Sequence, residues 1–587
     1  MMKTVPYFRF WCQKVLPLVY DESLSYYEVL CKCVDYINAL IKEDSQIIEN
    51  VDALKLDVEK VEKWIRDFNG KSVYKSVKDY GAFGDGEHDD TEAFQEMLAD
   101  TENYGFFYIP AGDYIISDTV EVPSNCRIVC DGTIHSTMPS PGGGVHVGLF
   151  DLDGVSNVTL SGLDIVGQVV VPITTAERSR NPDWLTAIYI HDSDAVVVDS
   201  CRIRLWEGGY CILVEDSRDV TVRDSYIKTY KFTGIALHYV AAPCEHCKIT
   251  GNSVIDCYSR TISGESGEVP NTYPIKLAGY DVRRPEQYLY PSVDVVCSGN
   301  YVENYFGWWE GIDAHGGNNL VITGNIVIGC AKGVTVSDRN DEYANYRLGA
   351  VVISDNVIEN QKNQSEFYHN ASCFCVEVSG GENISVTGNA LKYGGYGWRN
   401  TEGRRGGVYI AAAKDVLVEG NNISECSTSF FDVSSNANNV VIRGNNCKFT
   451  SVSDVLTHAP AIFRALNAPI SEGAIFTGYF GDNVLEAAPN KETREVQGSS
   501  TVPANGSYFK WAANTLRGTF ADSGGIGIFV PAHITPLQIG ALKYGHVGDV
   551  CMNSAPEEHS PIGWICTATQ GDDVSTTPAT WAALPNL

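Results

Sequence analysis

Four short phrases decide the fold, because each repeats one order of apolar and turn-forming residues. They read ITGNSV (residues 249–254), CSGNYV (297–302), ITGNIV (322–327) and ISDNVI (353–358). In each phrase a Gly or Asp precedes an Asn at the fourth position, and apolar residues stand at both ends. This pattern is typical of short β-strands separated by a tight turn.

The phrase recurs along most of the chain. Further copies read LSGLDI (160–165), VDSCRI (198–203), VRDSYI (222–227), VTGNAL (386–391), VEGNNI (418–423) and IRGNNC (442–447). Between fourth positions the smallest spacing is 24 residues, from 201 to 225, and the largest is 48, from 252 to 300. Such a period predicts a solenoid with one parallel coil per repeat, and a propeller blade would be longer. We expect the larger spacings to mark inserted loops, which often carry function.

Composition limits the possible partners. The chain has 587 residues, with 43 Lys and Arg against 73 Asp and Glu, and its formal net charge is −30. Because binding to nucleic acid needs a basic patch and no Lys/Arg run occurs, we expect no nucleic-acid partner. The 31 Tyr and 10 Trp residues suit sugars, since aromatic rings can stack on the apolar faces of sugar rings.

Cysteine usage and hydropathy argue against a disulfide framework, a metal site and a membrane-spanning segment. Several of the 18 Cys residues fall at apolar positions of the repeats, so we expect reduced core thiols rather than a disulfide framework. Cys244 and Cys247 form one C-x-x-C near His238 and His246, which is a weak zinc signal without a second pair. We therefore predict no metal and no cofactor. No signal peptide or membrane-spanning stretch is evident, so we expect synthesis in a cytoplasm and no membrane insertion.

A heptad pattern precedes the repeats. Between residues 26 and 68, mostly apolar residues advance by alternating steps of four and three: Tyr26, Leu30, Cys33, Ile37, Leu40, Asp44, Ile47, Val51, Leu54, Val58, Val61, Ile65 and Phe68. A single helix cannot bury such a stripe, so the pattern predicts an α-helical coiled-coil stalk shared with other copies of the chain. β-branched residues at both seam positions leave the number of copies open, and we expect a homotrimer. The alternative is two separate amphipathic helices that pack on a globular head.

A motif before the first repeat carries a family resemblance. It reads DYGAFGDGEHDDTEAFQEML (79–98), followed by GFFYIPAGDYIISDTVEVPSNCRIVCDG (105–132). This resembles the entry signature of the pectate-lyase-like β-helix proteins found in bacteriophage tailspikes. In that family a short helix, here expected from Asp89 or Asp90 through Met97, closes the open end of a right-handed parallel β-helix.

The resemblance implies a three-part, mainly β organisation. We expect a virion-attachment segment and stalk at residues 1–70, a right-handed parallel β-helix at 71–455, and a small C-terminal β-rich region at 456–587 for trimerisation, tip formation or carbohydrate binding. The implied partners are a host surface glycan and, through residues 1–70, a phage tail or baseplate protein. The implied location is the virion, acting at the host cell surface. The signature fits the fold but does not select an activity, because such folds carry hydrolases, lyases, epimerases and binders.

Aligning the second strand of each repeat predicts one column of outward side chains. The column contains Tyr189, Leu213 or Ile212, Ala236, Lys276, Asp313, Thr335, Glu377, Tyr409 and Asp432. Because neighbouring strands lie ~4.8 Å apart, these side chains should touch their neighbours and form the polar floor of a groove.

Glycosidic hydrolysis needs two carboxyl groups, ~6.5–9.5 Å apart for inversion and ~5–5.5 Å for retention. We expect Asp313 to be one member, with Glu377 or Glu310 as the other and His315 orienting either group. Expected substrate-binding residues are Lys276, Trp308, Trp309, Tyr409, His238 and Arg339. In the alternative interpretation, Asp313 and His315 only close turns, and the tryptophans pack beneath a loop.

Two other functions remain open at this point. A polysaccharide lyase would need a base such as Arg283, Arg284, Lys276 or Arg339 near calcium-held carboxylates, and no dense Asp cluster is evident. A non-catalytic receptor-binding spike would use the same groove without cutting its ligand. A glycoside hydrolase is the leading prediction.

Overall fold

The computed structural model describes residues 32, 74–100, 105–139, 141, 146–169, 171, 183–257, 273–280, 290–304, 310–340, 345–360, 373–395, 405–427, 429–434, 437–449, 461–466, 477–486, 493–497, 508–511, 514–517, 520–521, 529–530, 550–552, 563–568 and 580–584. The chain divides into two units, Met1–Tyr74 and Lys75–Leu587. The predicted coiled coil at residues 26–68 lies outside the described residues, apart from Lys32.

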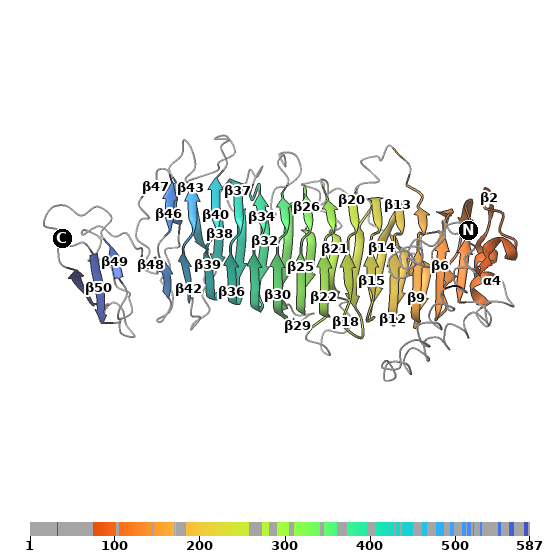
Figure 1. Ribbon diagram of the computed structural model, residues 1–587, viewed down its shortest axis with the longest axis horizontal. Coiled ribbons are helices and arrows are strands. Elements are labelled where there is room, and N and C mark those ends of the chain that lie inside the picture. The colour runs from red at the N-terminus through yellow and green to blue at the C-terminus, as the bar shows by residue number, and fades with distance from the viewer. Residues whose placement is uncertain are drawn as a thin grey trace. The chain divides into compact units, whose positions relative to one another are not determined.

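The second unit is a parallel β-solenoid in which three sheets run side by side (Figure 1). Sheet A contains β1 (Lys75–Ser76), β3 (Phe106–Ile109), β6 (Cys126–Cys130), β9 (Ser156–Ser161), β12 (Asp194–Asp199), β15 (Thr221–Arg223), β18 (Cys244–Glu245), β19 (Lys248–Thr250), β22 (Ser292–Ser298), β25 (Gly317–Thr323), β30 (Leu348–Ser354), β33 (Glu382–Thr387), β36 (Lys414–Glu419), β39 (Asn438–Arg443), β42 (Thr477–Gly481), β45 (Tyr508–Trp511) and β48 (Phe529–Val530).

Sheet B contains β2 (Asp85–Asp89), β4 (Asp113–Ile116), β7 (Thr133–Ser136), β10 (Asp164–Val166), β13 (Arg202–Trp206), β16 (Tyr226–Tyr230), β20 (Ser253–Cys257), β23 (Tyr301–Glu303), β26 (Ile326–Ile328), β31 (Val357–Glu359), β34 (Ala390–Lys392), β37 (Asn422–Cys426), β40 (Asn446–Phe449), β43 (Val484–Glu486) and β46 (Thr515–Arg517).

Sheet C contains β5 (Val120–Glu121), β8 (Val147–Asp153), β11 (Asp183–His191), β14 (Gly208–Glu215), β17 (Thr233–Tyr239), β21 (Tyr273–Tyr280), β24 (Glu310–His315), β27 (Lys332–Ser337), β32 (Cys373–Ser379), β35 (Arg405–Ala411), β38 (Ser429–Ser434), β41 (Ala461–Leu466), β44 (Thr493–Gln497) and β47 (Phe520–Ala521). From β3 onward the chain passes from sheet A to B to C in each coil and then returns to A, whereas α4 (Thr91–Ala99) follows β2 in the first coil.

The repeated phrase forms the turn between sheets A and B, and its Asn residues form a buried ladder. Side-chain hydrogen bonds join the members of this ladder in chain order: Asn252, Asn300, Asn325, Asn356, Asn389, Asn421, Asn445, Asn483 and Asn514. Within it, the Asn325 side-chain amide donates to Asn356 Oδ1 at 2.9 Å and to the Cys297 carbonyl at 3.0 Å. The ladder therefore satisfies buried polar groups coil by coil and holds successive coils in register.

The core lies between the three sheets. Apolar side chains from alternate positions of the strands fill it, and twelve buried cysteine thiols lie among the described residues. Cys244 and Cys247 are fully buried and donate to backbone carbonyls, so both side chains lie in the core.

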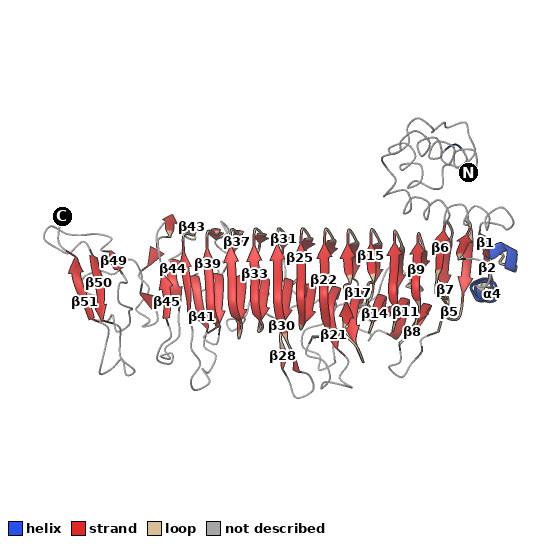
Figure 2. Cartoon of the chain, turned by 60° about the horizontal axis from the view of Figure 1, so that its bottom comes forward, coloured by secondary structure: helices blue, strands red, loops and turns tan. Residues whose placement is uncertain are grey.

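One end of the solenoid carries the described helices (Figure 2). They are the short 3-10 helix η2 (Val77–Tyr80) and α4 (Thr91–Ala99), which buries Phe94, Met97 and Leu98. Asp89 Oδ1 accepts a bond from the Thr91 backbone N–H, whereas the Asp90 side chain makes no helix-capping bond and binds the loop at Phe83 and Gly84. The helix therefore begins as expected and continues two residues beyond Met97.

The three sheets continue beyond residue 455. Strands β42, β45 and β48 extend sheet A, and Asn483 and Asn514 continue the ladder. The boundary expected at residue 455 thus lies within the sheets, because the repeat becomes harder to recognise in the sequence before the coils end. A three-stranded antiparallel sheet follows, formed by β49 (Val550–Met552), β50 (Gly563–Ala568) and β51 (Thr580–Leu584).

Candidate functional site

The outer face of sheet C brings together residues that lie far apart in the sequence. Strand register places one row in the order Asp151, Tyr189, Leu213, Ala236, Lys276, Asp313, Thr335, Glu377, Tyr409, Asp432 and Arg464. Leu213, rather than Ile212, occupies this row. Lys276, Asp313, Thr335 and Glu377 are consecutive members, as expected from the sequence.

A second row of side chains begins three residues earlier in the strands. It contains Thr186, Tyr210, Thr233 and Tyr273, and farther along Glu310 pairs with Lys332. A Cβ on Gly311 would meet core Val327, so this glycine faces the core next to inward-facing Ile312. Two consecutive inward positions break the alternation, and Glu310 and Asp313 can therefore lie on the same outer face.

Lys332 joins two carboxylates on this face. Its Nζ atom lies 2.9 Å from Glu310 Oε1 and 3.0 Å from Glu377 Oε2. We define the central cluster as Glu310, Asp313, Lys332 and Glu377, all of which are buried. Burial lowers the pKa of Lys332, but the two carboxylates outweigh it and raise the pKa above its ordinary value, so Lys332 is charged.

Asp313 differs from the two glutamates because none of the described lysines or arginines forms an ion pair with it. It is fully buried, and neither carboxyl oxygen has a hydrogen-bond partner among the described side chains. Burial raises the pKa of Asp313 well above its usual range and Glu310 adds to the effect, although Lys276 and Lys332 oppose it. Asp313 therefore favours its protonated form and can donate a proton.

The remaining predicted residues of the groove take different positions. His315 Nε2 lies 3.4 Å from Asp313 Oδ1, and Lys276 Nζ lies 4.7 Å from the centre of the Tyr273 ring. Tyr409 is buried and stacks on Phe374 at 4.9 Å. Trp308 and Trp309 lie outside the described residues. Arg339 lies in a separate antiparallel pair, β28 (Arg339–Asn340) with β29 (Asn345–Tyr346), and its side chain is outside the described part.

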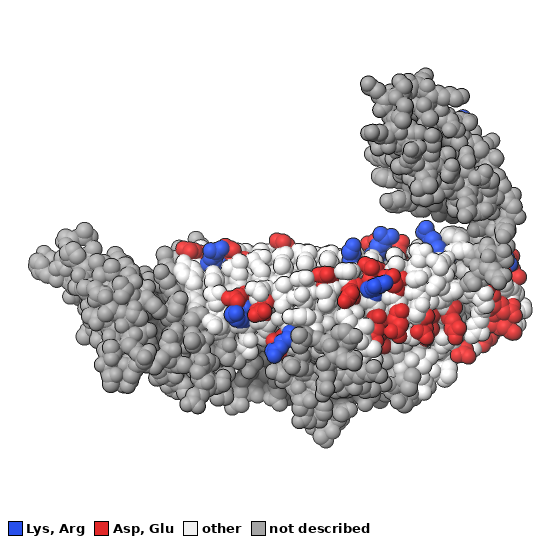
Figure 3. Space-filling model, turned by 90° about the horizontal axis from the view of Figure 1, so that it is seen from below, with Lys and Arg blue, Asp and Glu red and all other residues white. Residues whose placement is uncertain are grey.

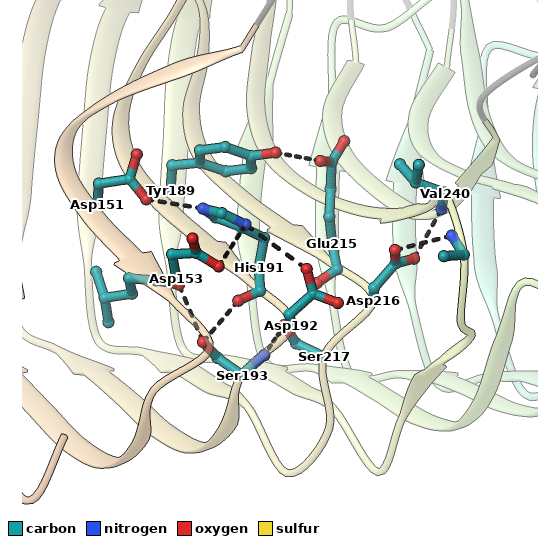
Figure 4. Close-up of polar contacts among 12 residues, drawn as sticks. Asp151, Asp153, Tyr189, His191, Asp192, Ser193, Glu215, Asp216, Ser217 and Val240 are labelled. Carbon is teal, nitrogen blue, oxygen red and sulfur yellow. Dashed lines mark hydrogen bonds and ion pairs between the residues drawn. The ribbon is translucent and has the colours of Figure 1, made fainter. Parts of the chain in front are cut away.

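A second polar group lies on strands β8 to β17, and Figure 4 shows its members Asp151, Tyr189, His191 and Glu215. His238 of β17 joins this group through Glu215. His238 Nδ1 lies 3.6 Å from Glu215 Oε1, and the Tyr189 hydroxyl donates to Glu215 Oε2. Burial acts to raise the pKa of Glu215, but His238 and the Tyr189 hydroxyl lower it to about 2. Glu215 is thus a buried, ionised acceptor.

His191 forms ion pairs with aspartates next to the group around Glu215. Its Nε2 lies 2.8 Å from Asp151 Oδ1 and its Nδ1 lies 3.3 Å from Asp153 Oδ1. Burial lowers the pKa of His191, yet the three nearby aspartates, including Asp192, raise it overall. Asp153, His191 and Asp192 also place ligand atoms within 4.8 Å of one another, but both aspartates are exposed and the contacts are explained by ion pairing.

Two features were missed from the sequence. Lys332 was missed because strict alternation along the strand would point its side chain into the core. The available signal was the glycine after it, since Gly333 follows Lys332 as Gly311 follows Glu310. The group around Glu215 was missed because its members come from four strands and no local motif connects them.

Comparison with protein families defines the class of this solenoid. Residues 74–259 match the family described as rhamnogalacturonase A/epimerase, pectate lyase-like, and residues 186–402 match the right handed beta helix region. This part of the chain is a pectate-lyase-like right-handed parallel β-helix, as the entry motif predicted.

Individual relatives include phage proteins. The chain is 32% identical over 142 residues to the pre-neck appendage protein of Bacillus phage B103, a match that covers 20% of this chain and 16% of that protein. An N-terminal fragment of bacteriophage phi29 gene product 12 has a TM-score of 0.52 at 16% identity, over 80% of this chain and 76% of the fragment. Tailspike protein 3 of bacteriophage CBA120 has a TM-score of 0.50 at 11% identity, over 87% and 68% respectively. The two structural similarities show the fold.

No helix among the described residues is long and apolar enough to cross a membrane.

Proposed function

We propose that the chain is a virion-borne tailspike that binds a host surface polysaccharide or wall glycan and cleaves it by hydrolysis. The observation that carries the proposal is the central cluster, which places the fully buried carboxyl of Asp313, whose pKa is raised, with the ion-paired carboxylates of Glu310 and Glu377 on one outer sheet face. The name of the phage B103 relative, a pre-neck appendage protein, supports a place on the virion.

In the proposed reaction Asp313 donates its proton to the glycosidic oxygen as the bond to the anomeric carbon breaks. Glu377 accepts a proton from a water molecule, whose oxygen forms the new bond to that carbon. Asp313 and Glu377 are separated by two strand spacings, about 9–10 Å, which suits inversion. Glu310 is the alternative second carboxylate, and its position in the same strand as Asp313 would favour a closer pair.

Lys332 contributes by holding Glu310 and Glu377. Because its ammonium pairs with both, it can fix the positions of the two side chains on the face that carries Asp313. His315 would orient the Asp313 carboxyl from 3.4 Å, and Lys276 would bind substrate beside Tyr273.

The chain would reach its target as part of a larger assembly. Residues 1–70 would attach to a phage tail or baseplate protein, and three copies would associate through the heptads at 26–68. A spike that binds glycan without cutting it is the second candidate. The full burial of Asp313 favours that candidate, because a substrate would need a change at the groove to reach the carboxyl.

The test is product analysis by mass spectrometry. The purified full chain is incubated with surface and wall polysaccharides from candidate hosts. Hydrolysis adds one water to each cleaved bond, elimination yields unsaturated products lighter by that water, and a binding spike yields no fragments. Asp313→Asn should stop fragmentation and preserve binding. The exposed Glu382→Gln on sheet A serves as the matched carboxyl-to-amide control.

A further inference from the structure

An aromatic cluster lies outside the core, on the outer face of sheet C. Its buried members are Tyr189, Tyr210, Leu213 and Ala236, and the half-buried rings of Trp184 and Phe232 pack against them. Outward positions of a solenoid strand normally meet water, so apolar residues in three neighbouring strands, β11, β14 and β17, indicate a surface adapted to bind something.

The rings form a continuous wall. Trp184 stacks on Tyr210 at 6.3 Å with 25° between their planes, and Phe232 meets Tyr210 edge-on at 5.6 Å. His146 lies 5.1 Å from Trp184 and 5.3 Å from Tyr210. Half-buried rings above buried ones provide flat apolar area, which suits the C–H face of a pyranose ring.

Polar groups beside this wall suit the hydroxyls of a sugar. Glu215 is ionised beside Tyr189 and His238, and an ionised carboxylate only accepts hydrogen bonds. In the row of Tyr210, the buried hydroxyls of Thr186 and Thr233 have no hydrogen-bond partner among the residues that the structure describes. Apolar rings with a few fixed polar groups are typical of a small-ligand site.

The wall is continuous with the central cluster. Ala236 is the strand neighbour of Lys276, and Lys276 is the strand neighbour of Asp313. Tyr210 in β14 and Glu310 in β24 are three strand spacings apart, which is about 14 Å. A single saccharide unit therefore cannot occupy both places, whereas a glycan chain parallel to the solenoid axis can.

Charge on this part of the surface separates a glycan from other occupants. Acidic side chains gather over the N-terminal coils in the view of Figure 3, and Asp153 and Asp192 are exposed beside the wall. A nucleic-acid strand would be repelled by these carboxylates, although its bases could stack on the rings.

We infer that the aromatic cluster of Trp184, Tyr189, Tyr210 and Phe232, with His146 and Glu215, is a saccharide-binding subsite for the glycan chain beyond the cleaved bond. This inference rests on the proposed function and adds that the substrate is a polymer that lies along sheet C and is cut within the chain. Units bound at the wall contribute affinity without taking part in bond breaking.

The experiment compares Trp184→Ala and Phe232→Ala with wild type in the full chain. The control is Tyr108→Ala, a surface tyrosine on β3 of sheet A, bonded to Asp131 and remote from sheet C. Affinities are measured in an Asp313→Asn background on a panel of bacterial capsular and wall polysaccharides. Circular dichroism and thermal melting report folding, and Trp184→Phe tests whether an aromatic ring at residue 184 is sufficient.

We expect each alanine variant to bind polymer about tenfold more weakly, with Trp184→Phe and Tyr108→Ala close to wild type. In the cutting enzyme, KM for polymer should rise while kcat is kept, because the lost contact is equal in ground and transition states. Unchanged polymer affinity in both folded alanine variants would overturn the subsite and leave the proposed function standing. Failure of wild type to bind any polysaccharide of the panel would overturn both.

Discussion

Lys332 Nζ lies 3.0 Å from Glu377 Oε2, between two neighbouring strands of sheet C. The same ammonium lies 2.9 Å from Glu310, so one buried cation pairs with two carboxylates that are far apart in the sequence. Removing the cation would leave both charges buried without their partner.

Lys332→Met should therefore destabilise the fold by roughly 3–5 kcal/mol, the usual cost of breaking a buried ion pair from one side. The free energy of unfolding by urea is the measurement. Lys414→Met, at an exposed lysine beside Asp415, is the matched control and should change it by less than about 1 kcal/mol. A similar small change for both variants would show that the central cluster is hydrated.

Compared with wild type, Asp313→Asn should have an unchanged or higher free energy of unfolding as pH rises. The raised pKa means that the folded chain holds this proton more tightly than the unfolded chain. The stability linked to that proton is complete below the unfolded pKa of ~3.9 and is lost as pH rises through the higher folded value. Because Asn has no carboxyl proton to lose, the unfolding free energy of the variant should depend less on pH than that of wild type. Parallel pH dependences in the two proteins would contradict a protonated Asp313.

Asn356→Ala should interrupt the ladder between coils. Asn356 Oδ1 accepts from Asn325, and its Nδ2 donates to the Ile322 carbonyl and to Asn389 Oδ1. The change leaves buried partners unsatisfied and should cost roughly 2–4 kcal/mol in chemical unfolding. Asn446→Ala removes an exposed Asn that donates to Asn422 Oδ1, and should cost less than about 0.5 kcal/mol. Equal costs would mean that the ladder carries no special stability.

His191→Gln should remove a pH-dependent part of the stability. The folded pKa of His191 is raised by Asp151, Asp153 and Asp192 against the effect of burial. Its contribution is complete below the unfolded pKa of ~6.5 and is lost as pH rises through the folded value. The free energy of unfolding of wild type should therefore exceed that of the variant at slightly acidic pH. This difference should shrink as the pH is raised to alkaline values. A difference that grows with pH would contradict the ion pairs.

The fold could be predicted from the sequence because its coils repeat one local pattern. Each Asn-containing phrase specifies a turn, and the 24-residue floor specifies one coil. Aligning the second strand of each repeat then places Lys276, Asp313, Thr335 and Glu377 in one row. The ladder itself was not predicted, since a polar residue at a turn gives no sign that it is buried.

The site was less predictable because its contacts depend on departures from regular strands. Lys332 reaches the outer face only because Gly333 faces the core, where its Cβ would meet Ile358. Glu215 acquires its environment from Tyr189 and His238 in neighbouring coils. Such contacts depend on how neighbouring strands are aligned. A local sequence pattern does not define which side chains, three residues apart in one strand, share the outer face.

The measurement that tests the central claim most directly is the anomeric configuration of the first product. Proton NMR records it during cleavage of the polysaccharide by the wild-type chain, before mutarotation. Because Asp313 and Glu377 are two strand spacings apart, we expect an inverted anomer, no product from Asp313→Asn and little product from Glu377→Gln. A retained anomer, or full activity of Glu377→Gln, would contradict the proposed pair.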